Sequence, residues 1–248
     1  MMRKKLSIVT VVYNGERFIE NAINSVISQK NEQVEYIIVD GGSTDSTLNI
    51  IEKYKNKIDI FISEKDKGIY DAMNKGWSKA TGEYVAFLNS DDFYQPGLLN
   101  SVLNETNKNP DMIVTNTLIQ DGEGKRKLFN RVTRKEDYKL HLRLPFMHPS
   151  VFIKKCIISK HNGFSLNYKI ASDCDLLLKV LNESISIEYV NAYIVMRLGG
   201  VSDVNYKLGR KEYRDIYFNH FNRKIKANIG YVESLLSHYC YKAIRILK

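Results

Sequence analysis

The feature that most limits the possible folds is a regular alternation of short apolar runs with segments of helical periodicity. Four runs indicate strands, at 8–12, 34–39, 58–62 and 84–88. Apolar residues recur at helical spacing in the segments between and after them, at 17–28, 48–54, 69–80 and 96–107. Strands that alternate with helices favour βαβ units and a largely parallel sheet. We therefore predict an α/β fold.

The pattern loosens after Met112. Residues 120–124 form a glycine-containing turn between short strand-like runs, which predicts an antiparallel hairpin. Further strands are expected at 151–153 and 187–195, and a short helix at 175–181. The sheet is accordingly expected to be mixed, with helices flanking it.

The C-terminal segment is strongly basic. Residues 205–248 contain ten Lys or Arg and three acidic residues, so they hold +7 of the net charge of +9. One apolar stripe at helical spacing runs through them, formed by Ile225, Ile229, Val232, Leu236 and Tyr239. This helical tail could pack on the domain, lie on an anionic membrane or bind nucleic acid, although no nucleic-acid motif accompanies it.

The cysteines and the N-terminus indicate the compartment. Cys156, Cys174 and Cys240 show no spacing typical of zinc sites or disulfide frameworks, which fits a reducing cytoplasm. The apolar run near the start leads into a polar loop without a cleavage site, so we predict a buried strand rather than a signal peptide. No apolar run approaches the ~20 residues needed to cross a bilayer.

Acidic side chains follow the strands where these run out into loops. Asp40 ends the second predicted strand, and Asp91 and Asp92 follow the fourth. Open α/β sheets bind their ligands at the carboxyl ends of their strands. Clustered carboxylates there repel one another, and oxygen ligands suit Mg²⁺ or Mn²⁺, which also bind diphosphates. The competing interpretation is a set of polar turns, with Asp45 as a helix cap.

Five motifs in order make the chain resemble family 2 glycosyltransferases. They are the strand at 8–14, the turn at 40–45, the segment 68–76, Gly82-Glu83-Tyr84, and Asn89 to Asp92. Looser similarity continues through 148–150, 172–173 and 199–202. The resemblance implies the GT-A fold, a nucleotide-sugar donor and inversion at the anomeric carbon. It also implies a glycosyltransferase domain at 1–204, with a nucleotide-binding half (1–95) and an acceptor-binding half (96–204), followed by the tail.

The resemblance carries roles onto the first half of the chain. Thr10, Tyr13 and Asp40 would line the nucleoside pocket, and Asp71 would help to hold the nucleoside. Asp91 would be the metal ligand for Mn²⁺ or Mg²⁺, with Asp92 in support. The chain departs from the family at Asn89, which replaces an Asp, and at Met73, which stands where many members have an Arg.

The base is expected at Asp173, where the family has an acidic pair before a helix and this chain has Ser172-Asp173. Because an Asp with a pKa of about 3.9 is a weak base in water, we expect partial burial to raise that pKa. Asp175 is the alternative base, and a helix-capping role for Asp173 is also compatible. Arg197 would assist the phosphates from a mobile loop, or is simply a surface arginine, and His148 could reach the acceptor. Trp77 is interpreted as a core residue rather than a sugar platform.

The predicted function is metal-dependent transfer from a nucleotide-sugar, with UDP favoured, to a glycan hydroxyl in bacterial polysaccharide synthesis. A polyprenyl-diphosphate-linked acceptor would place the protein in the cytoplasm, at the inner face of the membrane. The alternatives are a sugar nucleotidyltransferase, which usually has a glycine-rich basic loop after its first strand, and a catalytically silent nucleotide-sugar-binding subunit. A dehydrogenase is excluded because no GxGxxG follows the first strand.

Overall fold

Four parallel strands form the N-terminal half of the sheet. The computed structural model of the chain describes residues 4–130, 144–222, 228–229 and 231–232. The strands β1 (Leu6–Val12), β2 (Val34–Asp40), β3 (Ile60–Ser63) and β4 (Tyr84–Asn89) lie in the order β3-β2-β1-β4. All residues of β1 and β2 are buried, as expected for strands covered on both faces.

The sheet continues from β4 with reversed direction. β8 (Val151–Lys154) is antiparallel to β4 and to β6 (Met112–Gln120), and β9 (Ile187–Arg197) is parallel to β6. The edge strand β5 (Phe93–Tyr94) is antiparallel to β9. The predicted hairpin is confirmed, because β7 (Arg126–Asn130) pairs antiparallel with β6. The sheet is thus mixed, as predicted, and half of the eight described strand pairs are parallel.

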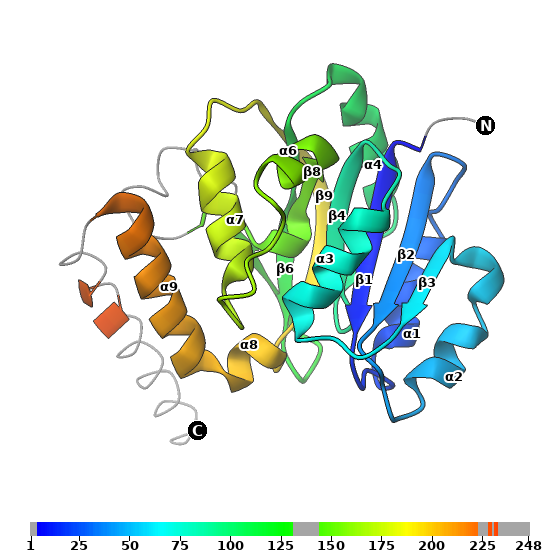
Figure 1. The fold of residues 1–248 in the computed structure, drawn as a ribbon. Helices are drawn as coiled ribbons and strands as arrows, with labels where there is room; N and C mark the ends of the chain where they lie inside the picture. The colour runs from blue at the N-terminus through cyan, green and yellow to red at the C-terminus, as the bar shows by residue number, and fades with distance from the viewer. Residues whose placement is uncertain (1–3, 131–143, 223–227, 230, 233–248) are drawn as a thin grey trace.

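Helices cover both faces of the sheet and give three layers (Figure 1). One face packs against α1 (Ile19–Ile27), α2 (Thr47–Glu52) and α4 (Leu98–Glu105). The other packs against α3 (Ile69–Lys79), α6 (Lys155–Lys160), α7 (Ser172–Leu181) and α9 (Tyr206–Phe221). Single turns complete the chain: η1 (Lys55–Lys57), η2 (Thr106–Lys108), η3 (His148–Ser150) and α8 (Val201–Val204). The α/β prediction and the core role of Trp77 are confirmed.

The helix expected at 175–181 begins earlier than predicted. It starts at Ser172, so Asp173 lies inside its first turn, and no side chain caps it. The capping interpretation of Asp173 is therefore wrong. The Asp45 carboxylate, by contrast, accepts from the amide of Thr47 in the first turn of α2, with Asp45 Oδ1 3.0 Å from that nitrogen.

The first part of the predicted tail packs on the domain. In α9, Ile216 and Tyr217 are buried in the core that α7 shares, and Figure 1 shows the two helices side by side. Of the predicted apolar stripe, Ile229 and Val232 are helical and half exposed. Ile225, Leu236 and Tyr239 lie outside the described residues.

Candidate active site at the rim of the sheet

The carboxyl ends of three parallel strands bring the predicted site residues to one rim. β1 lies between β2 and β4, with Val12 paired to Asp40 and Val11 paired to Asn89. The loops that follow β1, β2 and β4 therefore begin side by side. This convergence is the arrangement that the acidic residues after the strands predicted.

Asp40 organises the turn that follows β2. It has no exposed surface, and its carboxylate accepts from the amides of Gly42 (3.1 Å) and Ser43 (3.1 Å) and from the hydroxyl of Ser63 (2.8 Å). Gly42 has a φ of +85°, a conformation that suits glycine. Contact between Asp40 and a nucleoside base stays a prediction.

Thr10 and Tyr13 differ in accessibility. The Thr10 side chain is fully buried, and its hydroxyl accepts from Tyr36 Oη at 3.1 Å, so it offers no surface to a nucleoside. The nucleoside-pocket role of Thr10 was predicted from its position in the motif, but β1 is covered on both faces at that residue. Tyr13, just beyond the strand, is 63% exposed and is available for stacking.

Asp71 lies in the first turn of α3. Its Oδ2 accepts from the Lys67 amide at 3.0 Å and lies 3.5 Å from Lys75 Nζ. Met73, at the position where the resemblance expects a cation, is fully buried in the core. Lys75 supplies a cation beside Asp71, although it also pairs with Glu64 at 2.8 Å.

Asp91 and Asp92 occupy different environments. Asp92 is 1% exposed, and its carboxylate accepts from the Arg197 amide (3.0 Å) and from Asn89 Nδ2 (3.1 Å). Burial, together with the neighbouring Asp91 charge, raises the pKa of Asp92 well above its ordinary value. Asp92 thus stabilises the turn after β4 by joining it to the end of β9. Burial also raises the pKa of Asp91, against the opposing charges of Arg197 and His148.

The fit of a divalent metal can be tested on these side chains. Within the described ranges, no group of three or more His, Cys, Asp or Glu side chains is arranged to hold a metal ion. Asp91 and the buried Asn89 Oδ1, which has no hydrogen-bond partner in the described part of the chain, are oxygen donors of the type that Mg²⁺ accepts. The residues therefore fit a metal that shares its coordination with a diphosphate, and they do not form a complete protein cage.

Arg197 is held by protein groups. Its guanidinium donates to the backbone carbonyl of Asp91 and to Asn21 Oδ1 (2.9 Å). The guanidinium carbon lies 4.8 Å from the ring centre of Phe18 and 4.6 Å from that of Phe93. These contacts hold Arg197 in place and connect α1, β5 and the turn after β4 through it. The guanidinium is thus held in place rather than mobile, and a contact between its remaining N–H groups and a diphosphate stays a prediction.

Asp173 forms the centre of a second polar cluster, here called the Asp173 centre, with His148 and Tyr70. Its Oδ2 lies 3.0 Å from His148 Nδ1, and its Oδ1 lies 2.8 Å from the Tyr70 hydroxyl. Burial alone would raise the pKa of Asp173, but the hydrogen bonds from His148 and Tyr70, with the positive charge of His148 when its ring is protonated, outweigh burial and lower that pKa. The prediction of a raised pKa was therefore wrong, because it considered burial without partners.

Asp175 faces away from this centre. It pairs with Lys179 (2.6 Å) and with His220 of α9 (2.9 Å). Two residues along a helix point to different sides, so the alternative base is engaged at the interface between α7 and α9.

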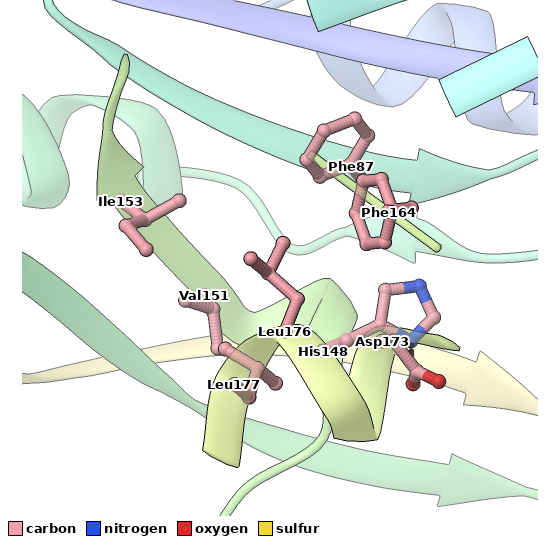
Figure 2. A pocket seen from close by; sticks show the side chains of 8 residues that line it. All are labelled: Phe87, His148, Val151, Ile153, Phe164, Asp173, Leu176 and Leu177. Carbon is pink, nitrogen blue, oxygen red and sulfur yellow. Dashed lines mark ion pairs between the residues drawn. The ribbon is translucent and has the colours of Figure 1, made fainter. Parts of the chain in front are cut away.

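The Asp173 centre borders a small apolar cavity of about 20 Å³, room for about one water molecule. Figure 2 shows His148 and Asp173 together at one end of it. The other lining side chains are apolar: Phe87, Val151, Ile153, Phe164, Leu176 and Leu177. On this side, the Asp173 centre therefore contacts apolar side chains rather than solvent.

Two residues that the sequence did not single out support the centre. Tyr70 lies beside Asp71 in the 68–76 motif, so its position was a usable signal. Glu212 of α9 is buried, and its carboxylate accepts from the amides of Lys169 (2.9 Å), Ile170 (2.9 Å) and Ala171 (3.0 Å). These amides directly precede α7, so Glu212 holds the segment that presents Asp173. No local pattern points to it.

None of the helices in the described ranges combines the length and apolar character required to span a lipid bilayer.

The chain is similar to several bacterial proteins described as uncharacterized or putative glycosyltransferases. Over 230 residues it is 29% identical to the uncharacterized glycosyltransferase RT0329 of Rickettsia typhi, with 89% of this chain and 72% of the relative aligned. It is 38% identical over 101 residues to TuaG, a putative teichuronic acid biosynthesis glycosyltransferase of Bacillus subtilis. That alignment covers 40% of each chain, so similarity to TuaG concerns part of both proteins.

Solved structures share the architecture. TarS 1–349 of S. aureus, in complex with UDP-GlcNAc, superposes with a TM-score of 0.70 at 20% identity, covering 96% of this chain and 73% of TarS. The mannosyltransferase PcManGT of Pyrobaculum calidifontis, in complex with GDP-Man and Mn²⁺, gives 0.65 at 17% identity, covering 90% and 65%. Residues 7–162, more than half of the chain, match the family described as glycosyl transferase family 2. The chain is therefore a GT-A-fold protein that belongs to glycosyl transferase family 2.

Proposed function

We propose that this glycosyltransferase moves a hexosyl or N-acetylhexosaminyl group from a nucleotide-sugar to a glycan hydroxyl with inversion. The observation that carries the proposal is the proximity of two polar centres with different chemistry, Asp91 at the rim and the Asp173 centre. Asp91 offers a carboxylate at the rim just beyond the end of β4, and Phe87 of the same strand lines the cavity that His148 and Asp173 border. One centre suits the diphosphate of a donor and the other suits removal of a proton.

The donor side is proposed around the loops after β1 and β2. Tyr13 would stack on the base, the turn shaped by Asp40 would border the nucleoside, and Asp71 would lie near it. Mn²⁺ or Mg²⁺, held by Asp91, would offset the negative charge of the departing nucleoside diphosphate. The Mn²⁺ in the similar PcManGT structure supports a divalent metal.

Inversion requires a single displacement with the base and the leaving group on opposite faces of the sugar. The Asp173 centre would deprotonate the acceptor hydroxyl on one side, while the diphosphate leaves toward Asp91 on the other. UDP is favoured as the nucleotide because the TarS structure with the higher TM-score contains UDP-GlcNAc, although PcManGT contains GDP-Man.

A donor screen tests the proposal directly. Thermal stabilisation by a panel of UDP-, GDP- and dTDP-sugars is measured with and without Mn²⁺, and nucleoside diphosphate release is then followed for the best donor. We expect one nucleotide class to stabilise the protein in a metal-dependent way, and Asp173→Asn to release about 10²–10⁴-fold less product. A silent binding subunit would bind without release in either form. A nucleotidyltransferase would instead release diphosphate from a nucleoside triphosphate.

For the acceptor, we propose a lipid-linked glycan in polysaccharide synthesis, which the relation to TuaG supports. Such an acceptor would bring the protein to the cytoplasmic face of an anionic membrane. Lys207 and Lys211 lie exposed on α9 and are candidates for contact with that surface. No nucleic-acid partner is proposed.

Membrane contact is tested by charge removal rather than by deletion, because deleting α9 would remove Ile216 and Tyr217 from the core. Lys207→Gln with Lys211→Gln should weaken co-sedimentation with anionic liposomes by about 1 kcal/mol for each charge. Lys53→Gln with Lys57→Gln removes the same charge near α2, at the opposite end of the molecule (Figure 1). Equal losses of liposome binding in the two double variants would contradict a membrane-contacting surface centred on α9.

A further inference from the structure

The hydrogen bond between His148 and Asp173 determines where the imidazole proton lies. Nδ1 of His148 faces Asp173 Oδ2 at 3.0 Å. An ionised carboxylate only accepts hydrogen bonds, so the proton must lie on Nδ1 for this bond to form. The neutral ring then carries its lone pair on Nε2, which makes Nε2 the proton-accepting atom of the pair.

The second ring nitrogen is buried and lacks a partner. No group in the described part of the chain makes a hydrogen bond to His148 Nε2, although the side chain as a whole is 17% exposed. A buried polar atom without a partner is unfavourable, and such atoms in native proteins call for a functional or solvent explanation. The adjoining cavity is almost entirely apolar and provides few partners to hold a water molecule there. A hydroxyl group from a ligand would satisfy the nitrogen.

Asp173, in contrast, already accepts one hydrogen bond at each of its two oxygens. His148 takes Oδ2, and the Tyr70 hydroxyl lies 2.8 Å from Oδ1. The same hydroxyl is 2.7 Å from the carbonyl of Ile170, so its single proton is shared between two acceptors. The lowered pKa of Asp173 agrees with a carboxylate that stays ionised and orients a partner rather than one that takes up protons itself.

We propose that His148 Nε2 accepts the proton of the acceptor hydroxyl, and that Asp173 is a positioning residue that fixes the ring tautomer and stabilises the imidazolium. The inference rests on the transfer reaction proposed above and names the atom that performs one of its steps. It assigns His148 a catalytic role in place of the acceptor-side contact predicted from the sequence.

The step balances without any further reactant. The acceptor O–H bond breaks and its proton bonds to His148 Nε2. The oxygen electron pair forms the new bond to the anomeric carbon, while the bond from that carbon to the diphosphate oxygen breaks and its electron pair leaves with the nucleoside diphosphate. The imidazolium returns its proton to water after the products depart.

The test compares His148→Ala with the native protein, using the donor identified by the screen. We expect nucleoside diphosphate release to show a kcat lower by about 10²–10⁴-fold, the range for a general base, with metal-dependent donor stabilisation retained. Added imidazole should restore at least about tenfold of the lost kcat, because the small base can enter the space left by the ring. A purely structural role would not respond to imidazole.

Three variants sharpen the comparison. His148→Gln keeps a side chain that can donate to Asp173 but has no basic nitrogen, so it should lose as much kcat as His148→Ala and serves if the latter does not fold. Asp173→Asn added to His148→Ala should cost little more, since the pair acts as one unit. His161→Ala removes a histidine that pairs with Glu183 and should change neither turnover nor the response to imidazole.

Several results would overturn the assignment. If His148→Gln keeps kcat within about tenfold while Asp173→Asn is inactive, Asp173 is the direct base. If His148→Ala abolishes metal-dependent donor stabilisation, the ring serves the metal or the diphosphate. If the native protein binds donors but releases no nucleoside diphosphate, the proposed function itself fails, and this outcome is distinguishable because it appears before any substitution.

Discussion

Asp91→Asn is expected to lower kcat by at least about 10²–10³-fold, the range for removal of one electrostatic contact to a developing charge. The substitution keeps the shape of the side chain but removes the charge that would share a divalent metal with the diphosphate. Donor-induced thermal stabilisation should therefore lose its dependence on Mn²⁺. Nucleoside diphosphate release and differential scanning fluorimetry measure the two effects on the same samples.

The neighbouring Asp92 provides the matched comparison. Asp92→Ala leaves two part-buried donors, the Arg197 amide and the Asn89 side chain, without an acceptor, at about 1 kcal/mol for each group. We expect this variant to lower Tm clearly, whereas Asp91→Asn should change stability by no more than about 0.5 kcal/mol. Retention of metal-dependent turnover by Asp91→Asn would disprove the assigned division of roles between the two carboxylates.

Glu212→Ala is expected to cost about 2–4 kcal/mol of unfolding free energy and to reduce kcat. Three amides would lose the carboxylate that now accepts from them. The bond from Ala171 is buried and those from Lys169 and Ile170 are part-buried, and an unpaired buried donor costs about 1–3 kcal/mol. The segment before α7 would then loosen, and Asp173 would lose its fixed position relative to His148. Urea unfolding measures the first effect, and the ratio of kcat to donor KM measures the second.

Glu212→Gln and Lys211→Ala are the controls for this contact. Glutamine retains one carbonyl acceptor and should recover part of both losses, whereas Lys211→Ala changes an exposed neighbour on the same helix. Donor KM should stay nearly constant throughout, because Glu212 touches the segment before α7 and none of the loops after β1, β2 or β4. An unfolding free energy within about 0.5 kcal/mol of the native value for Glu212→Ala would refute the role of the contact.

The acidic residues at the rim of the sheet could be predicted because each lies directly after the strand that places it there. Asp40 and Asp91 directly follow buried strands, and parallel pairing brings such positions together regardless of the rest of the chain. Asp173 was singled out differently, by the family resemblance, in which an acidic pair before a helix corresponds to Ser172-Asp173. Residue type and spacing were sufficient only for the positions at the strand ends.

The partners of these residues could not be predicted, because they come from distant segments. Arg197 binds Asn21, 176 positions away, and Asp173 binds Tyr70, 103 positions away. Each contact changes what the side chain can do. Arg197 is held in place by protein oxygens rather than mobile, and the pKa of Asp173 is lowered rather than raised. Asp92 was interpreted as metal support because the sequence does not reveal that Asn89 and the end of β9 already satisfy it.

The position of β9 sets the shortest segment that can be produced as a stable protein. β9 lies between β6 and β5 in the sheet, although it follows the family-matched residues 7–162 in sequence. An expression clone ending at 162 would leave two strands with unpaired edges, a known route to aggregation. Any shortened or chimeric version of this enzyme must therefore extend at least through Phe221, the last residue of α9.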